Sequence, residues 1–177
     1  MRVELDNLLK QLEPFRREFR NVSRETGMFL NQLIKKYKPK NILEIGMSNG
    51  YSAIWLASAA EEINAKAAAI EIDENKISLA KENFKRAALK NINIIHGAAL
   101  EIIPKLKEKY DFIFIDAVKS EYLKYLRLLI PKLNKPAVIT AHNVISWKHK
   151  MLDYLEFVKQ FKTKTYKELD LEVTYFH

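Results

Sequence analysis

The stretch NILEIGMSNGYSAIWLA, residues 41–57, decides the fold because it joins an apolar strand to an amphipathic helix through a glycine turn. Gly46 lets the backbone turn and approach a ligand closely, since glycine has no Cβ to clash. Free N–H groups at the helix start, near Gly50, Tyr51 and Ser52, can face a polar group. The stretch therefore predicts a βα unit that holds a nucleotide-like cofactor.

The spacing of the glycines narrows the choice of cofactor. A dinucleotide fingerprint, G-x-G-x-x-G, needs a second glycine two residues after the first, where this chain has Ser48. The run E-x-G-x-x-x-G-x-S instead resembles motif I of class I S-adenosylmethionine (SAM) dependent methyltransferases. Two alternatives remain: an ordinary βα turn of a parallel sheet, and a nicotinamide-dependent oxidoreductase, which the missing glycine argues against.

A second acidic residue ends the next strand. The run AKAAAIEID, residues 65–73, places Glu71 roughly twenty residues after the glycine turn, where a carboxylate can accept hydrogen bonds from two ribose hydroxyls. A solvated strand end is the alternative reading. The spacing from Gly46 favours a role in cofactor binding.

Composition predicts one cytosolic domain. The chain has 177 residues, 48% of them hydrophobic, and contains no linker-like segment, so we expect a single domain over 1–177, with N-terminal helices in 1–38 and a core in 41–177. No apolar run is long enough to cross a bilayer, and the N-terminus does not read as a signal peptide. The absence of cysteine excludes disulfides and thiolate chemistry.

Strands and helices alternate along the chain, which predicts an α/β fold: a mostly parallel, Rossmann-like sheet of six or seven strands flanked by helices. We expect strands at 41–45, 67–72, 92–97, 110–117 and 137–144, and helices at 3–13, 16–37, 122–130 and 151–161.

The last segment, residues 163–177, alternates apolar and polar residues like one long half-buried strand. The alternative is a split at Leu169–Asp170 by an unfavourable turn. If the chain lacks a seventh strand, an apolar edge is left that a second subunit can cover, which predicts a homodimer.

The chemistry-bearing residues follow the fourth and fifth strands. Asp116 ends DFIFIDA with Lys119 three residues on, and His142 and Asn143 end ITAHN. From about residue 23 to 161 the chain resembles the O-methyltransferases related to catechol and caffeoyl-CoA O-methyltransferases. The resemblance implies that Lys119 deprotonates the acceptor hydroxyl, that Asp116 and Asn143 bind a divalent metal ion, and that SAM lies among Glu44, Gly46, Gly50, Ser52, Glu71, Gly97, Ala98 and Asp116.

Two residues depart from the family pattern. His142 replaces the family's strand-five Asp, and an imidazole ligand suits Zn²⁺, Mn²⁺, Fe²⁺ or Ni²⁺ better than Mg²⁺. It also permits a metal-free site in which His142 is the catalytic base. Ala98 stands where many relatives carry a polar side chain near the adenine, so backbone groups are expected to recognise that ring.

The acceptor is less defined. We expect a hydroxylated small molecule, methylated by direct displacement. The net charge of +8 and a possible helix face of Arg16, Arg20 and Arg24 allow RNA instead, since some relatives methylate a hydroxylated wobble uridine in tRNA. The plainer reading of that face is a solvated surface paired with Glu13, Glu18 and Glu25. A SAM-binding domain without catalysis is a further alternative.

Overall fold

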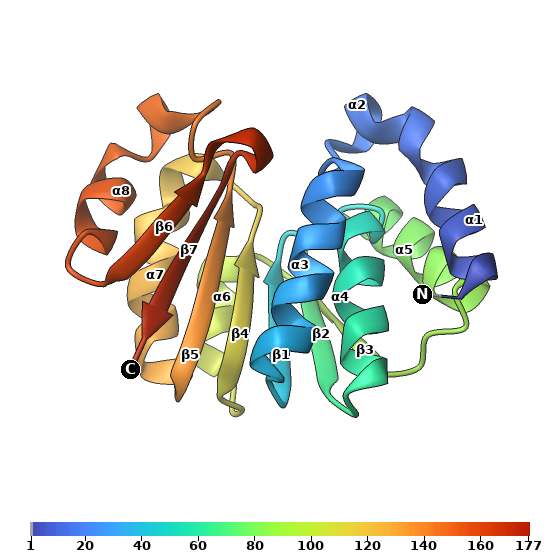
Figure 1. Ribbon diagram of the computed structural model, residues 1–177, viewed down its shortest axis with the longest axis horizontal. Coiled ribbons are helices and arrows are strands. Elements are labelled where there is room, and N and C mark those ends of the chain that lie inside the picture. The colour runs from blue at the N-terminus through green and yellow to red at the C-terminus, as the bar shows by residue number, and fades with distance from the viewer. Residues whose placement is uncertain (1) are drawn as a thin grey trace.

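The computed structural model describes residues 2–177 and contains one seven-stranded sheet in the order β3-β2-β1-β4-β5-β7-β6 (Figure 1). The first five strands run parallel, and β7 is antiparallel to both β5 and β6. The predicted α/β fold with a mostly parallel sheet is therefore confirmed. The strands are β1 Asn41–Ile45, β2 Lys66–Glu71, β3 Ile92–His96, β4 Tyr110–Ile115, β5 Leu133–His142, β6 Lys162–Tyr166 and β7 Leu171–Phe176.

Helices cover both faces of the sheet and divide the core into two apolar clusters. One cluster joins the sheet to α1 Val3–Leu12, α3 Arg24–Tyr37, α4 Tyr51–Glu62 and α5 Glu74–Arg86. The other joins it to α6 Ala99–Ile102, α7 Tyr122–Leu129 and α8 Leu152–Val158. Short 3₁₀ helices include η3 Lys119–Glu121, η5 Lys148–Lys150 and η6 Lys167–Leu169.

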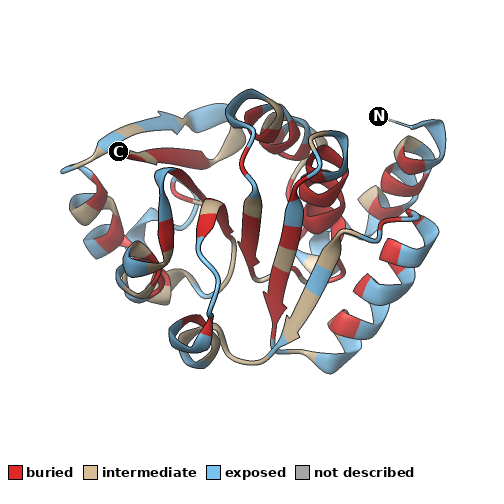
Figure 2. Cartoon of the chain, turned by 90° about the horizontal axis from the view of Figure 1, so that it is seen from below, coloured by how far each residue is buried: buried red, intermediate tan, exposed pale blue. Residues whose placement is uncertain are grey.

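The central strands are deeply buried (Figure 2). Leu43 on β1, Ile113 and Phe114 on β4 and Ile139 on β5 have no exposed surface. Their strands read as near-continuous apolar runs because a parallel sheet is covered on both faces. This rigid centre fixes the carboxyl ends of β1, β2, β4 and β5, where the candidate site lies.

The C-terminal segment folds back on itself. The helix η6 is followed by Asp170, whose backbone is left-handed with φ of 52°, and this turn separates β6 from β7. Aspartate tolerates that conformation better than most residues. The expectation of one long strand is wrong, and the split at Leu169–Asp170 is confirmed. Because the seventh strand is present, the argument for a homodimer from a missing strand loses its basis.

The predicted helix over 16–37 is broken. The helix α2 Arg16–Phe19 ends at Arg20, which is left-handed with φ of 57°. A new helix, α3, begins after Ser23, whose side chain accepts a hydrogen bond from the Thr26 backbone N–H at 3.1 Å and so caps the helix start. Among residues 2–177 no helix has both the length and the apolar character that a bilayer crossing requires.

Candidate active site

The site lies at the carboxyl ends of the parallel strands, where open α/β sheets bind their ligands. The strands β1 and β4 are neighbours at the centre of the sheet, and the helices that follow them, α4 and α7, pack on opposite faces. Glu44, Glu71 and His142 lie near the ends of β1, β2 and β5, and Asp116 follows β4 directly. The topology therefore brings four predicted site residues to one edge of the sheet.

The glycine turn after β1 is shaped by packing against the protein itself. Gly46 has φ of 87°, and a Cβ there would lie 2.7 Å from the Asp116 carbonyl oxygen. Gly50 has φ of 86°, and its Cβ would lie 2.8 Å from a ring carbon of Phe84. Both positions require glycine because the backbone is left-handed and its surroundings are full.

Two backbone N–H groups of this turn donate hydrogen bonds to other residues of the same turn. The Gly50 N–H donates to the Met47 carbonyl at 2.9 Å, and the Tyr51 N–H donates to Asn49 Oδ1 at 3.3 Å. The expectation that these two N–H groups are free for a ligand is therefore wrong. These two amides are therefore not free to bind a phosphate, in keeping with a cofactor that has none.

Glu71 is a buried carboxylate held by backbone donors. Its Oε1 accepts hydrogen bonds from the N–H groups of Ile72 at 2.9 Å and Asp73 at 3.1 Å, and its Oε2 accepts one from Ser48 at 2.8 Å. A carboxylate has about four acceptor positions. One position thus remains on Oε2 for a ribose hydroxyl, and the pairing of Glu71 with both hydroxyls stays a prediction.

Ser48 links this carboxylate to the N-terminal helices. While its N–H donates to Glu71, its hydroxyl donates to the Phe19 carbonyl at 2.9 Å. Sequence reasoning missed this residue, because serine at a position where glycine was sought carries no signal of its own.

Glu44 is a carboxyl group without a cation. It is 1% exposed, its Oε1 accepts a hydrogen bond from Ser52 Oγ at 2.5 Å, and its Oε2 is buried without a partner. Burial, reinforced by the negative charges of Asp116 and Glu71, raises the pKa of Glu44 to about 8. The carboxyl groups of Glu44, Glu71 and Asp116 thus lie close together in a chain whose net charge is +8.

Asp116 is the centre of a compact polar cluster. Its Oδ1 lies 2.5 Å from Lys119 Nζ, and its Oδ2 lies 3.1 Å from His142 Nδ1. Burial alone would raise the pKa of Asp116, but the positive charge of Lys119 and the hydrogen-bonded His142 outweigh it, so that this pKa is lowered. Lys119 also donates to the Tyr122 hydroxyl at 3.0 Å, and that hydroxyl lies 3.1 Å from the His142 carbonyl.

Asn143 does not join this cluster. Its backbone is left-handed with φ of 62°, and its Nδ2 donates to Asp170 Oδ2 at 3.3 Å and to Ser146 Oγ at 3.4 Å. Asp170 also accepts from the Ile145 N–H at 2.6 Å and so organises the loop after β5. Sequence reasoning missed the role of Asp170, because its partners lie more than twenty residues away.

These residues do not fit a divalent metal ion as they are placed. Both Asp116 oxygens are engaged by side chains of this chain, and the Asn143 amide faces Asp170. Among residues 2–177 there is no group of three or more His, Cys, Asp or Glu side chains suited to holding a metal. The metal set Asp116, His142 and Asn143 that the resemblance implies is therefore not assembled.

The third strand reaches the site through its backbone. Gly97 donates its N–H to the Glu71 carbonyl at 2.9 Å, and a Cβ on Gly97 would lie 2.8 Å from Ile102. Ala98 is the residue before α6 and provides no side-chain cap. Gly97 thus adjoins Glu71, and recognition of the adenine by backbone groups beside Ala98 stays a prediction.

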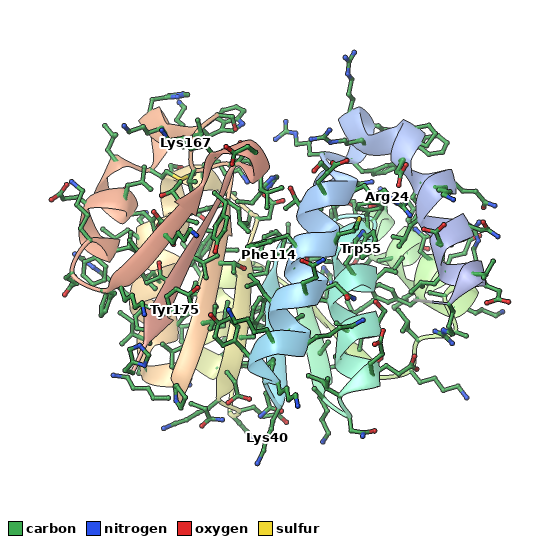
Figure 3. All side chains as sticks on the ribbon, in the orientation of Figure 1. Arg24, Lys40, Trp55, Phe114, Lys167 and Tyr175 are labelled. Atoms are coloured by element: carbon green, nitrogen blue, oxygen red, sulfur yellow. The ribbon has the colours of Figure 1, made fainter. Side chains whose placement is uncertain are left out.

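The predicted arginine face is not formed. Arg20 ends α2, so Arg16, Arg20 and Arg24 do not share one helix. Arg24 is paired with Asp6 and Glu13 and lies over the ring of Trp55, its guanidinium 5.6 Å from the ring centre (Figure 3). The pairing of Arg24 with Glu13 agrees with the interpretation of these arginines as a surface paired with glutamates. The arginine helix face that favoured RNA binding is absent over residues 16–24.

Comparison with known proteins assigns the family. The model of a family described as O-methyltransferase matches residues 3–171. The chain belongs to this family. A catechol O-methyltransferase of Niastella koreensis is 38% identical over 131 residues, which are 71% of this chain and 58% of that protein. A caffeoyl-CoA O-methyltransferase of Medicago sativa is 35% identical over 130 residues, or 70% of this chain and 52% of that protein.

Solved structures share the fold. The methyltransferase PaMTH1 of Podospora anserina, with S-adenosylhomocysteine (SAH) bound, has a TM-score of 0.88 at 20% identity, covering 100% of this chain and 89% of that one. An O-methyltransferase of Bacillus cereus in complex with SAH has a TM-score of 0.82 at 23% identity, covering 99% and 92%. The fold of this chain is that of class I methyltransferases. The chain spans a little over half the length of the curated relatives it matches.

Proposed function

We propose that this protein is a SAM-dependent O-methyltransferase that methylates a hydroxyl group of a small molecule. The observation that carries the proposal is the cluster of three carboxyl groups, those of Glu44, Glu71 and Asp116, at the carboxyl ends of the strands, in which only Asp116 has a cationic partner. SAM brings a sulfonium and an ammonium group, and positive charge near these carboxylates offsets the cost of burying them. Two relatives of the same fold were solved with SAH bound, which supports the same choice.

Exposed apolar side chains follow the strands that carry Asp116 and His142. Val118 follows Asp116 and is 55% exposed, and the loop after β5 carries Ile145 and Trp147, which are 47% and 42% exposed. Exposed large apolar side chains beside polar catalytic groups suit a flat, partly apolar ligand. The names of the relatives, catechol and caffeoyl-CoA O-methyltransferase, support a hydroxylated aromatic acceptor.

The reaction we propose is a direct displacement. The acceptor oxygen attacks the sulfonium methyl group while a side chain near Asp116 removes the hydroxyl proton, and Lys119 and His142 are the two candidates. Alignment of the two reactants supplies a large part of the rate in such reactions. The chain's contribution is therefore to hold both partners in line and to take one proton.

Replacement of Glu71 tests the cofactor assignment. We expect Glu71→Ala to weaken SAM and SAH binding by about 1.5 to 3 kcal/mol, because a ribose hydroxyl loses a charged acceptor. Isothermal titration calorimetry measures this loss, and Glu82→Ala, at an exposed position of α5, is the matched control. Equal affinity in Glu71→Ala and the control would remove the assignment.

The acceptor is then found by methyl transfer from isotopically labelled SAM to catechols, hydroxylated flavonoid-like compounds and tRNA. Label in a small phenolic product supports the proposal. SAM binding without transfer to any acceptor would instead favour a SAM-binding domain that has lost catalysis.

A further inference from the structure

The His142–Asp116 contact determines which ring nitrogen of His142 carries hydrogen. The carboxylate of Asp116 is paired with the Lys119 ammonium and acts only as an acceptor, so the contact with His142 Nδ1 at 3.1 Å requires an Nδ1–H. That nitrogen therefore has no lone pair for a metal ion. The other nitrogen, Nε2, has no hydrogen-bond partner among residues 2–177. It is also not fully buried, so a ligand can reach it.

Lys119 is fixed as a donor. Its Nζ donates to Asp116 Oδ1 at 2.5 Å and to the Tyr122 hydroxyl at 3.0 Å, and Tyr122 is fully buried. The side chains of Asp116, Lys119 and His142 are only 12%, 16% and 8% exposed, so the cluster is largely shielded from water. The ammonium supplies the positive charge that neutralises Asp116, which is what a metal ion would otherwise do at this carboxylate.

We propose that, in the methyl transfer proposed above, this site works without a divalent metal ion and that His142 Nε2 is the base, positioned by Asp116. The acceptor O–H bond breaks and its proton forms a new bond to the Nε2 lone pair. The oxygen electron pair attacks the sulfonium methyl carbon, and the C–S bond breaks with its electron pair remaining on sulfur as SAH forms. The imidazolium then returns its proton to water. Asp116 acts as in other carboxylate–histidine pairs: it holds the ring orientation and the tautomer.

Direct metal binding tests the first half of the proposal without any acceptor. Titration of the purified full chain with Mn²⁺, followed by the electron paramagnetic resonance signal of the free ion, should show no stoichiometric site. A single site that disappears in Asp116→Asn would overturn the proposal. SAM calorimetry on the same sample reports separately whether the cofactor assignment holds.

Nuclear magnetic resonance of the histidine rings tests the geometry. Long-range ¹H–¹⁵N spectra of the full chain distinguish the two tautomers, and the His142 signals are identified by their loss in His142→Gln, with His177→Gln as the control. We expect the Nδ1–H tautomer in the wild type and its loss in Asp116→Asn. An Nε2–H tautomer in the wild type would contradict the assignment.

Kinetics separates His142 from Lys119 as the base. We expect His142→Gln to lower kcat by about a hundredfold or more, the size of a general-base contribution, with the affinity for SAM unchanged. Lys119→Arg keeps a cation that cannot accept a proton, so it should lower kcat by less than His142→Gln does. A loss of kcat in Lys119→Arg as large as that in His142→Gln would assign the base to Lys119. Loss of wild-type turnover on addition of a chelator would show that the reaction needs a metal ion.

Discussion

Glu44 shows how the position of one residue sets its protonation. The same side chain on the surface would be ionised at neutral pH, but here burial and two neighbouring carboxylates raise its pKa to about 8. Ser52 gives it one hydrogen bond, and its second oxygen has no partner. Glu44 therefore carries a proton that an arriving cation can displace.

This leads to a prediction about the binding of SAM. At about pH 7 we expect SAM to release up to about one proton from Glu44, because the sulfonium charge lowers the pKa of the carboxyl group. Calorimetry in buffers of different ionisation enthalpy measures the number released. SAH lacks the sulfonium and should release fewer protons, while Glu44→Gln should abolish the difference between the two ligands. A difference that persists in Glu44→Gln would refute the assignment.

At this scale the sequence predicted where the site residues meet but not how they pair. Glu44, Glu71, Asp116 and His142 follow parallel strands, whose carboxyl ends necessarily lie together. Asn143 was predicted to share a ligand set with Asp116, yet its left-handed backbone turns the amide toward Asp170. A φ value and a partner far along the chain leave no mark on the local sequence.

At the scale of elements, Asp170 connects the turn between β6 and β7 to the loop after β5. Its carboxylate accepts hydrogen bonds from the Ile145 and Ser146 N–H groups, from the Ser146 hydroxyl and from Asn143. Lys167, which opens this turn, is labelled in Figure 3. One side chain thus holds the loop that carries Ile145 and Trp147 in place.

Two substitutions separate the hydrogen bonds of Asp170 from its backbone conformation. Asp170→Gly keeps the left-handed turn and should lower the free energy of unfolding by about 1.5 to 3 kcal/mol, the value of hydrogen bonds to a charged group. Asp170→Ala should cost about 1 to 2 kcal/mol more, because a Cβ disfavours φ of 52°. Urea denaturation measures both values. Equal stability of the two variants would show that the turn relaxes.

The elements themselves were predictable to different degrees. The strands β1 to β5 were recognised because buried parallel strands are apolar runs bounded by turn residues. The break between α2 and α3 was not, since it rests on a left-handed Arg20 and not on a glycine or proline. The hairpin of β6 and β7 was left open for the same reason, as Asp170 makes the turn alone.

On the scale of the whole molecule, the two halves of the sheet are joined by α3. The Thr26 hydroxyl donates to the Leu169 carbonyl at 3.3 Å, and the rings of Phe29 and Tyr166 lie 4.5 Å apart. On the opposite face of β7, Glu172 is buried with Oε1 unpartnered, close to the equally unpartnered Tyr154 hydroxyl. Burial raises the pKa of Glu172 to about 7.

The stability of the protein should therefore fall as pH rises. A carboxyl group whose pKa is raised from 4.5 in the unfolded chain to about 7 in the folded one is favourable while protonated, and ionisation removes that contribution between those values. We expect Glu172→Gln to be more stable than the wild type by about 2 to 3 kcal/mol at about pH 8, with little difference below about pH 4.5. Urea denaturation at both values, with exposed Glu168→Gln as the control, measures this. A pH-independent difference would be inconsistent with the buried proton.

A buried cluster of carboxyl groups in a chain of net charge +8 makes the electrostatic attraction of a ligand depend on its distance. The surplus of positive charge acts over the Debye length, about 8 Å at physiological salt, and draws anionic molecules toward the surface at a rate that salt reduces. The carboxyl groups of Glu44 and Glu71 act only at contact, where water is excluded and salt screens little. Such a molecule therefore selects its ligands in two steps. The long-range positive potential favours the approach of anionic molecules, and the buried carboxyl groups favour the retention of a ligand that carries a cationic group.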